Sequence, residues 1–298
     1  MRRLVLLYNP SSSRFLRVEK EVLAPLRQVS GLMICKVEVK KTNIEENIQR
    51  LAKILMDDDL LVVAGGDGTA SIGLNAAIIS RKKVQFSALP YGNFNDMART
   101  LGAKNILATI NTKHCRKFYP LEIRVNGKIW RYAGCYMTAG MFAESTEVFD
   151  EKKVRKNLKK NNNNLIFSVL TLAKWYFKNH KKHLFLPEFR LNGKKVKKQT
   201  TDYLAINGKS VAKVMRGGKY FENQQKFLSN TARLGSFSRL MAFMVKSIIR
   251  GIGGKTTAND VLEFAEPANI ELQIEGEYQH FRQVFKIEVE KSAHFVLY

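Results

Sequence analysis

The chain has 298 residues, 45% of them apolar, which is enough to bury the cores of two domains and argues against a disordered or fibrous protein. Its 50 Lys and Arg against 26 Asp and Glu give a formal charge of +24, which favours an acidic partner, either a nucleic acid or an anionic membrane. Its three cysteines indicate neither a disulfide scaffold nor a zinc ribbon, and no stretch offers the ~20 apolar residues of a spanning helix, so we expect a soluble or peripheral protein in a reducing compartment.

The first part of the chain alternates between short apolar runs and segments with helical periodicity. The runs are 4–8, 34–39, 60–64 and 84–89, each typical of a strand buried on both faces, and the helical segments are 16–29, 43–56 and 69–80. This alternation predicts an α/β domain with a doubly wound parallel sheet over residues 1–117. Ligands of such sheets bind outside the carboxyl ends of the strands.

The second part of the chain has closely spaced strands joined by tight turns. Asn126-Gly127, Asn192-Gly193 and Glu275-Gly276 are typical hairpin turns. They predict an antiparallel β domain over residues 118–283, with a basic exposed loop at 151–164, and we expect the segment 284–298 to rejoin the first domain.

Two apolar helices are expected in this second domain. Residues 237–249 carry one apolar stripe with i, i+3, i+4, i+7 spacing, typical of a helix packed on the core. Residues 165–177 are apolar almost all round and are flanked by lysines. Such a segment either is buried or lies in a membrane interface, and burial is the commoner arrangement.

A glycine-rich turn follows the third predicted strand. Residues 65–69 read Gly-Gly-Asp-Gly-Thr and lead directly into a predicted helix. Glycines let the backbone bring N–H groups against phosphate oxygens, and the helix N-terminus adds positive potential. Asp67 could hold Mg²⁺ between nucleotide phosphates. Gly-Asp-Gly is also ordinary turn material, but its place between a buried strand and a helix favours phosphate binding.

A second polar turn follows the fourth predicted strand. Pro90 ends that strand, Gly92 permits another close backbone approach, and Asn95, Asp96 and Arg99 bring polar groups to the same edge of the sheet. Taken alone, this segment is also compatible with a helix start in which Asn95 or Asp96 is the N-cap.

These motifs resemble the diacylglycerol kinase catalytic domain family, which bacterial lipid kinases share with sphingosine and ceramide kinases. The resemblance rests on G-G-D-G-T at 65–69 and P-x-G-x-x-N-D-x-A-R at 90–99. The segment 9–13 is similar to the family's N-P-x-S-G start, and 273–277 is similar to its Q-x-D-G-E segment. The four motifs occur in family order, so the resemblance extends over most of the chain.

The resemblance implies an N-terminal α/β nucleotide-binding domain (1–117) and a C-terminal antiparallel β domain on the lipid-substrate side (118–283). It also implies an active site in the cleft between them and transfer of the ATP γ-phosphoryl group to a lipid hydroxyl. It implies Glu275 as the general base, with Asp67 and Asp96 as further catalytic acidic groups and Asp67 and Glu277 at Mg²⁺. Thr42 is explained equally well as a helix N-cap. The expected nucleotide-binding residues are Asn9, Thr42, Gly65, Gly66, Gly68, Thr69, Gly92 and Asn95.

The sequence departs from the family pattern at several positions. Glu275 replaces the Asp that takes the proton from the lipid hydroxyl, and the extra methylene moves the carboxylate by more than ~1 Å unless the backbone shifts. Asn93 replaces Thr, and Ser13 replaces Gly. Leu234-Gly235 stands where bacterial members have an acidic D-G segment at a structural Mg²⁺, so we expect that metal site to be absent. A catalytically impaired nucleotide- or lipid-binding homologue therefore remains open.

Two other readings remain. NAD kinases share the G-G-D-G-T loop, whereas the segments 90–99 and 275–277 favour lipid kinases. The lysine runs at 152–160 and 194–198 suit nucleic acid, but no helix-turn-helix, RNP or zinc-finger pattern indicates a specific nucleic-acid partner. The same charges suit an anionic membrane, so we expect a cytoplasmic enzyme peripherally associated with the inner membrane.

Overall fold

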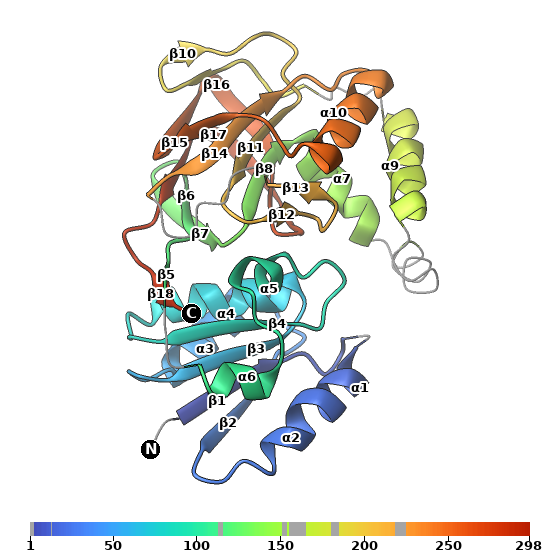
Figure 1. Cartoon of the computed structure of the whole chain (residues 1–298). Coiled ribbons are helices and arrows are strands. Elements are labelled where there is room, and N and C mark those ends of the chain that lie inside the picture. Colours follow the sequence, from blue (N-terminus) through green and yellow to red (C-terminus); the bar gives the residue numbers. More distant parts are fainter. Residues whose placement is uncertain are drawn as a thin grey trace. The chain divides into compact units, whose positions relative to one another are not determined.

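The computed structural model describes residues 3–12, 14–112, 116–150, 154, 165–179, 185–217 and 225–298 (Figure 1). The chain divides into two units. The first comprises Met1–Pro120, Phe221–Gln225 and Ser292–Tyr298, and the second comprises Leu121–Tyr220 and Lys226–Lys291. Of the basic loop expected at 151–164, every residue except Val154 lies outside the described residues.

The first unit is built on a mixed, largely parallel sheet. The order is β2 (Met33–Glu38), β1 (Arg3–Tyr8), β3 (Leu60–Gly65), β4 (Gln85–Pro90), β18 (Val296–Leu297) and β5 (Lys117–Phe118). The strands from β2 to β18 pair in parallel, and β5 is antiparallel to β18. β1 and β3 consist of apolar runs that are almost entirely buried, as expected for strands covered on both faces.

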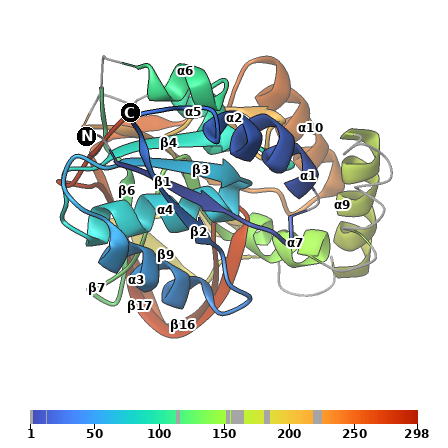
Figure 2. The same cartoon turned by 90° about the horizontal axis from the view of Figure 1, so that it is seen from below.

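Helices cover both faces of this sheet (Figure 2). On one face, α1 (Phe15–Val18), the π-helical turn Glu19–Leu23, α2 (Ala24–Leu26) and α6 (Ile106–Ile110) share a core with β1 and β3. On the other face lies α4 (Asp67–Ile79), with α3 (Ile44–Ile54) beside it. A Cβ added to Gly73 of α4 would lie 2.5 Å from Val63 of β3, so this glycine permits close packing of helix and sheet. The predicted doubly wound sheet is confirmed.

The second unit contains a 10-stranded antiparallel sheet among its described residues. Its main path is β15 (Lys255–Thr257), β14 (Phe227–Ala232), β11 (Asp202–Ile206), β8 (Tyr136–Gly140), β16 (Asn259–Ile274), β17 (Glu277–Lys291), β6 (Leu121–Val125) and β7 (Lys128–Ala133). β9 (Phe189–Leu191) pairs with β16, and β10 (Lys194–Lys195) pairs with β9. β12 (Ser210–Val211) and β13 (Met215–Arg216) form a separate pair.

The three predicted hairpin turns connect neighbouring strands of this sheet. Asn126-Gly127 joins β6 to β7, Asn192-Gly193 joins β9 to β10, and Glu275-Gly276 joins β16 to β17. All six turn residues have φ between 51° and 90°, the left-handed region that such two-residue turns require. The predicted antiparallel β domain is confirmed.

The segment that returns to the first unit is shorter than the expected 284–298. β17 continues to Lys291 and pairs with β16 on one side and β6 on the other. The side chains of Ile287, Val289 and Lys291 alternate with more exposed ones and face the core. Only Ser292–Tyr298 returns, and its β18 joins the sheet of the first unit.

Three helices of the second unit are described in full or in part: α7 (Met141–Asp150), α9 (Leu165–Asn179) and α10 (Phe237–Ile249). α10 has the predicted bounds and buries Leu240 and Met244. Over its described side chains α9 is buried on one side only, because Trp175 and Tyr176 are buried whereas Phe177 is exposed. Within the described part of the chain, no helix is long and apolar enough to cross a membrane.

Candidate nucleotide-binding and catalytic site

Two glycine turns of the first unit touch at the carboxyl edge of its sheet. β3 and β4 are parallel neighbours, so the turns that follow them meet, and Tyr91 N–H donates to Gly65 O over 3.2 Å. A Cβ built on Gly92 would lie 2.2 Å from Cα of Gly66. Only glycine at position 92 allows the two backbones to approach this closely.

Asp67 fastens the second turn to the first. Its Oδ2 accepts the N–H of Asn95 over 2.8 Å and its Oδ1 accepts the N–H of Met97 over 3.2 Å, so it caps α5 (Asp96–Leu101). Asn95, with φ of 57°, occupies the N-cap position, but its side chain bonds Gly92 instead: Oδ1 accepts from Gly92 N and Nδ2 donates to Gly92 O. The cap acceptor therefore comes from a different loop, not from Asn95 or Asp96.

The two carboxylates of this site differ in their surroundings. Asp96 is buried, and its Oδ1 accepts from Arg99 Nη2 over 2.5 Å. Burial raises the pKa of Asp67, and the nearby charge of Asp96 raises it further, against the lowering effect of the backbone N–H donors. The arrangement suits a polyanion with a bound cation, because a cation near Asp67 would stabilise its charged form.

The predicted glycine loop begins a helix with unpaired first-turn donors. Gly66 is the N-cap of α4, and N–H groups of a first helical turn have no partner within the helix. They are the natural ligands for phosphate oxygens. The Thr69 side chain is buried and packs against Gly65, where an added Cβ would lie 2.7 Å from it. Gly65, Gly66, Gly68 and Thr69 thus form one compact turn.

The other predicted nucleotide residues lie in loops after β1 and β2. Asn9 Oδ1 accepts from Ser11 N over 2.9 Å, which shapes the turn after β1. The N-cap of α3 is Asn43, whose side chain accepts from Glu46 N over 2.7 Å. The N-cap explanation of Thr42 is therefore wrong: Thr42 is exposed and accepts from Asn47 Nδ2 over 3.1 Å.

The predicted base lies in the second unit. Glu275 is buried in the turn between β16 and β17, and its Oε1 accepts the N–H of Cys135 between β7 and β8. Glu277, partly exposed, begins β17. Asn207 holds the same Cys135 loop from another side, donating from Nδ2 to Gly134 O over 2.8 Å and from its backbone N–H to Cys135 O over 2.7 Å.

Lys291 is a buried residue that belongs to none of the sequence motifs. It is 8% exposed, and its Nζ donates to Asn207 Oδ1. Burial lowers the pKa of Lys291 to about 7. The sequence does contain a signal for it, because Lys291 continues the phase of Ile287 and Val289, where an apolar residue is expected.

Lys291→Met should stabilise the protein more at neutral than at alkaline pH. An unfolded lysine titrates near 10.4, so between about pH 7 and 10 the unfolded chain binds more protons and the wild type gains stability as the pH rises. The advantage of Lys291→Met, up to about 4 kcal/mol at pH 7, should shrink toward pH 10. Unfolding midpoints measured at pH 7, 8.5 and 10 test this. The exposed Lys128→Met is the control, and parallel pH curves for wild type and Lys291→Met would contradict it.

No ready-made metal cage is present in the described part of the chain, where no three His, Cys, Asp or Glu side chains converge on one point. Mg²⁺ in kinases needs only one or two carboxylates, because phosphates and water supply the other ligands. Asp67 fits that requirement as a single ligand, since a carboxylate has about four lone-pair sites and Asp67 accepts the backbone N–H groups of Asn95, Asp96 and Met97.

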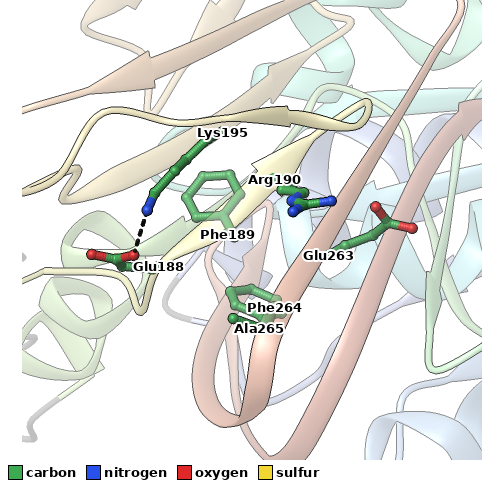
Figure 3. Close-up of a pocket in the computed structure, with 7 residues that line it drawn as sticks. All are labelled: Glu188, Phe189, Arg190, Lys195, Glu263, Phe264 and Ala265. Carbon is green, nitrogen blue, oxygen red and sulfur yellow. Dashed lines mark ion pairs between the residues drawn. The ribbon is translucent and has the colours of Figure 1, made fainter.

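A groove of about 440 Å³ lies elsewhere in the second unit, beside the paired strands β9 and β16 (Figure 3). In Figure 3, Lys195 reaches toward Glu188, and the two form an ion pair of 3.1 Å. None of the predicted site residues lines the groove. Its walls are Glu188, Phe189, Arg190, Lys195, Glu263, Phe264 and Ala265.

The part of the chain that contains both glycine turns is similar to known proteins. The model of the diacylglycerol kinase catalytic domain matches residues 3–119. A diacylglycerol kinase of Bacillus subtilis (strain 168) is 30% identical over 133 residues, 43% of each chain. A diacylglycerol kinase of Staphylococcus carnosus (strain TM300) is 29% identical over 102 residues, 34% of this chain and 33% of that protein. Each match thus spans less than half of the curated relative.

The fold likeness extends much further than the sequence match. A crystal structure of a diacylglycerol kinase from Bacillus anthracis str. Sterne superposes with a TM-score of 0.64 over 99% of this chain and 96% of that one, at 14% identity. At that identity the likeness concerns the fold. The chain shares this fold throughout, and within it residues 3–119 match the diacylglycerol kinase catalytic domain.

Proposed function

We propose that the protein is an ATP-dependent lipid kinase that phosphorylates the hydroxyl of a diacylglycerol-like lipid, at the cytoplasmic surface of the inner membrane. The observation that carries this proposal is the contact of the Gly66 and Gly92 turns, fastened by Asp67 at the start of two helices. Such a paired turn offers backbone N–H groups and a carboxylate to one polyphosphate. The family match supports the same chemistry.

In this proposal the first unit holds the nucleotide. The first-turn N–H groups of α4 bind phosphate oxygens, and Asn9, Thr42, Gly92 and Asn95 shape the surrounding loops. Asp67 would hold Mg²⁺ together with the phosphates, and Glu277 would support the metal or the base. The ion, when bound, neutralises charge on the transferring phosphoryl group.

In the second unit, Glu275 acts as the general base. The lipid hydroxyl oxygen attacks the γ-phosphorus, the bond from that phosphorus to the β,γ-bridging oxygen breaks, and ADP leaves. The hydroxyl proton passes to the Glu275 carboxylate. The bond from Cys135 N–H fixes the orientation of that carboxylate, which is the condition for efficient proton transfer.

Incubation with labelled ATP and Mg²⁺ tests the proposal. The acceptors are diacylglycerol, monoacylglycerol, a sphingoid base and phosphatidylglycerol in mixed micelles, with NAD as a soluble acceptor. We expect label in diacylglycerol or a close relative, and none without Mg²⁺. Labelled NAD would assign the protein to NAD kinases instead, and absence of label from every acceptor would contradict a kinase function.

A second candidate function is a nucleotide- or lipid-binding protein without turnover. Glu275 is buried and its carboxylate accepts the N–H of Cys135. Both features are also expected of a glutamate that only stabilises the turn, and they favour this candidate. Binding of ATP by calorimetry, combined with no transfer to any lipid, would support this candidate.

A further inference from the structure

Helices α9 and α10 of the second unit expose large apolar side chains. Leu170 and Phe177 of α9 are 59% and 55% exposed, and Val245 and Ile249 of α10 are 49% and 64% exposed. The two helices lie side by side in both views of the chain (Figures 1 and 2), and the Phe177 and Phe237 rings touch at 4.8 Å. Several exposed apolar side chains on two neighbouring helices mark an interaction site more often than single scattered residues do.

The exposed residues of α10 form a stripe opposite its buried face. Ala242, Val245 and Ile249 share one side of the helix by their spacing, and all three are exposed. The buried residues Leu240 and Met244 fasten the other side. The stripe is therefore a second apolar face, which the packing of α10 within the second unit does not use.

Both helices lie in long stretches without acidic residues. No Asp or Glu occurs between Glu151 and Glu188, or between Glu222 and Asp260. Exposed basic residues stand beside the apolar ones: Lys174 and Lys178 on α9, and Arg239, Lys246 and Arg250 at α10. An apolar face with basic residues beside it on both helices is complementary to an anionic lipid surface, whose phosphates and acyl chains lie within a few ångström of each other.

We propose that the outer faces of α9 and α10 dock the second unit on an anionic bilayer. We call this surface the α9–α10 face and define it by Leu170, Lys174, Phe177, Val245, Lys246 and Ile249. The four apolar side chains enter the boundary between headgroups and acyl chains, and the lysines bind lipid phosphates. The inference rests on the proposed function, because a kinase whose lipid substrate stays in the membrane must bind at the membrane surface.

Cosedimentation with vesicles tests the docking surface without any requirement for turnover. The full chain should bind vesicles of phosphatidylglycerol and phosphatidylcholine, and bind pure phosphatidylcholine vesicles much more weakly. Val245→Gln combined with Ile249→Gln should lower the affinity by about tenfold or more, because two exposed aliphatic side chains lose their apolar contact with the bilayer. Lys246→Gln alone should lower it by about fivefold and weaken its salt dependence.

A matched control removes two equally exposed apolar residues from strands of the same unit. Ile129→Gln combined with Phe285→Gln changes residues that are 50% and 54% exposed on β7 and β17, and should leave vesicle affinity unchanged. Equal loss of affinity in the control and α10 variants would overturn the proposal, as would full binding by the Val245→Gln, Ile249→Gln variant. Concentration-dependent dimers of the wild type, lost in that variant, would assign the face to a second copy instead.

Turnover of a short-chain, water-soluble diacylglycerol separates this inference from the proposed function. The α10 variant should phosphorylate the soluble lipid at the wild-type rate and the vesicle-borne lipid more slowly. If no variant phosphorylates either lipid while vesicle binding still depends on the face, the kinase proposal fails and the docking surface stands. If both lipids are phosphorylated equally well by wild type and variant, the docking surface fails and the kinase proposal stands.

Discussion

Glu275→Gln should lower kcat by about 10² to 10⁴-fold while leaving ATP affinity within about twofold of the wild type. Glutamine has the same shape, and its amide oxygen can still accept the N–H of Cys135 that Glu275 Oε1 accepts now. The turn between β16 and β17 should therefore keep its geometry. What is lost is a group able to take the hydroxyl proton, and this loss affects the chemical step alone. Steady-state kinetics with a diacylglycerol substrate, together with calorimetric titration of ATP, measures both quantities.

The control for this variant is Glu266→Gln, an exposed glutamate on the same strand β16, which should leave kcat unchanged. Glu275→Asp tests the extra methylene. The shorter side chain restores the residue usual in the family, but it withdraws the carboxylate from Cys135 N–H by more than ~1 Å, so intermediate activity is expected. Wild-type turnover in Glu275→Gln would remove Glu275 from the base role and leave it as a structural residue of the turn.

The first unit was largely predictable because its signals are local. Each buried run, such as 60–64, is short, apolar and bounded by turn residues, and these features predict a strand before any contact is known. Chain order then predicts a parallel sheet, and a parallel sheet brings the turns after neighbouring strands to one edge. The meeting of Gly66 and Gly92 follows from the pairing of β3 with β4, which was not itself in the sequence.

The sequence does not indicate which side chains of distant segments bond to each other. Asp67 was predicted as a ligand of Mg²⁺, and the structure adds that it caps α5, a helix that begins 29 residues further along the chain. The sequence cannot distinguish the two roles of Asp67, because a ligand of Mg²⁺ and a cap of α5 would occupy the same place in the motif. Lys291 is a similar case. The alternation in β17 predicts that its side chain faces the core, but nothing near it in the sequence indicates its partner, Asn207.

Strand ends are governed by pairing more than by composition. The sequence after Gln283 offers the same alternation whether it belongs to one sheet or the other, so the return to the first unit was placed too early, at 284. The actual return comes where β17 has lost both of its partners, β16 and β6, after Lys291. Register between strands far apart in sequence decides this boundary, and periodicity alone contains no information about it.

Gly92→Ala should destabilise the first unit by about 1–3 kcal/mol and weaken ATP binding by about 10²-fold. The added Cβ would lie 2.2 Å from Cα and 3.1 Å from N of Gly66, and these are backbone atoms that no side-chain rotation can move. The two turns must therefore separate by more than 1 Å to restore ordinary contact. That movement pulls Asn95 away from Asp67 and shifts the first-turn N–H groups of α4. Thermal unfolding and calorimetric titration of ATP measure the two effects.

The size of the steric overlap allows a graded series that separates backbone crowding from a general effect of replacing glycine. A Cβ on Gly66 would lie 3.2 Å from Cα of Gly92, so Gly66→Ala should destabilise the unit less than Gly92→Ala. Gly253→Ala, with no atom within 4 Å of the added Cβ, should change neither stability nor ATP affinity. If Gly92→Ala unfolds at a lower temperature but binds ATP as the wild type does, the phosphates lie away from the paired turns, and the nucleotide site assigned to them is wrong.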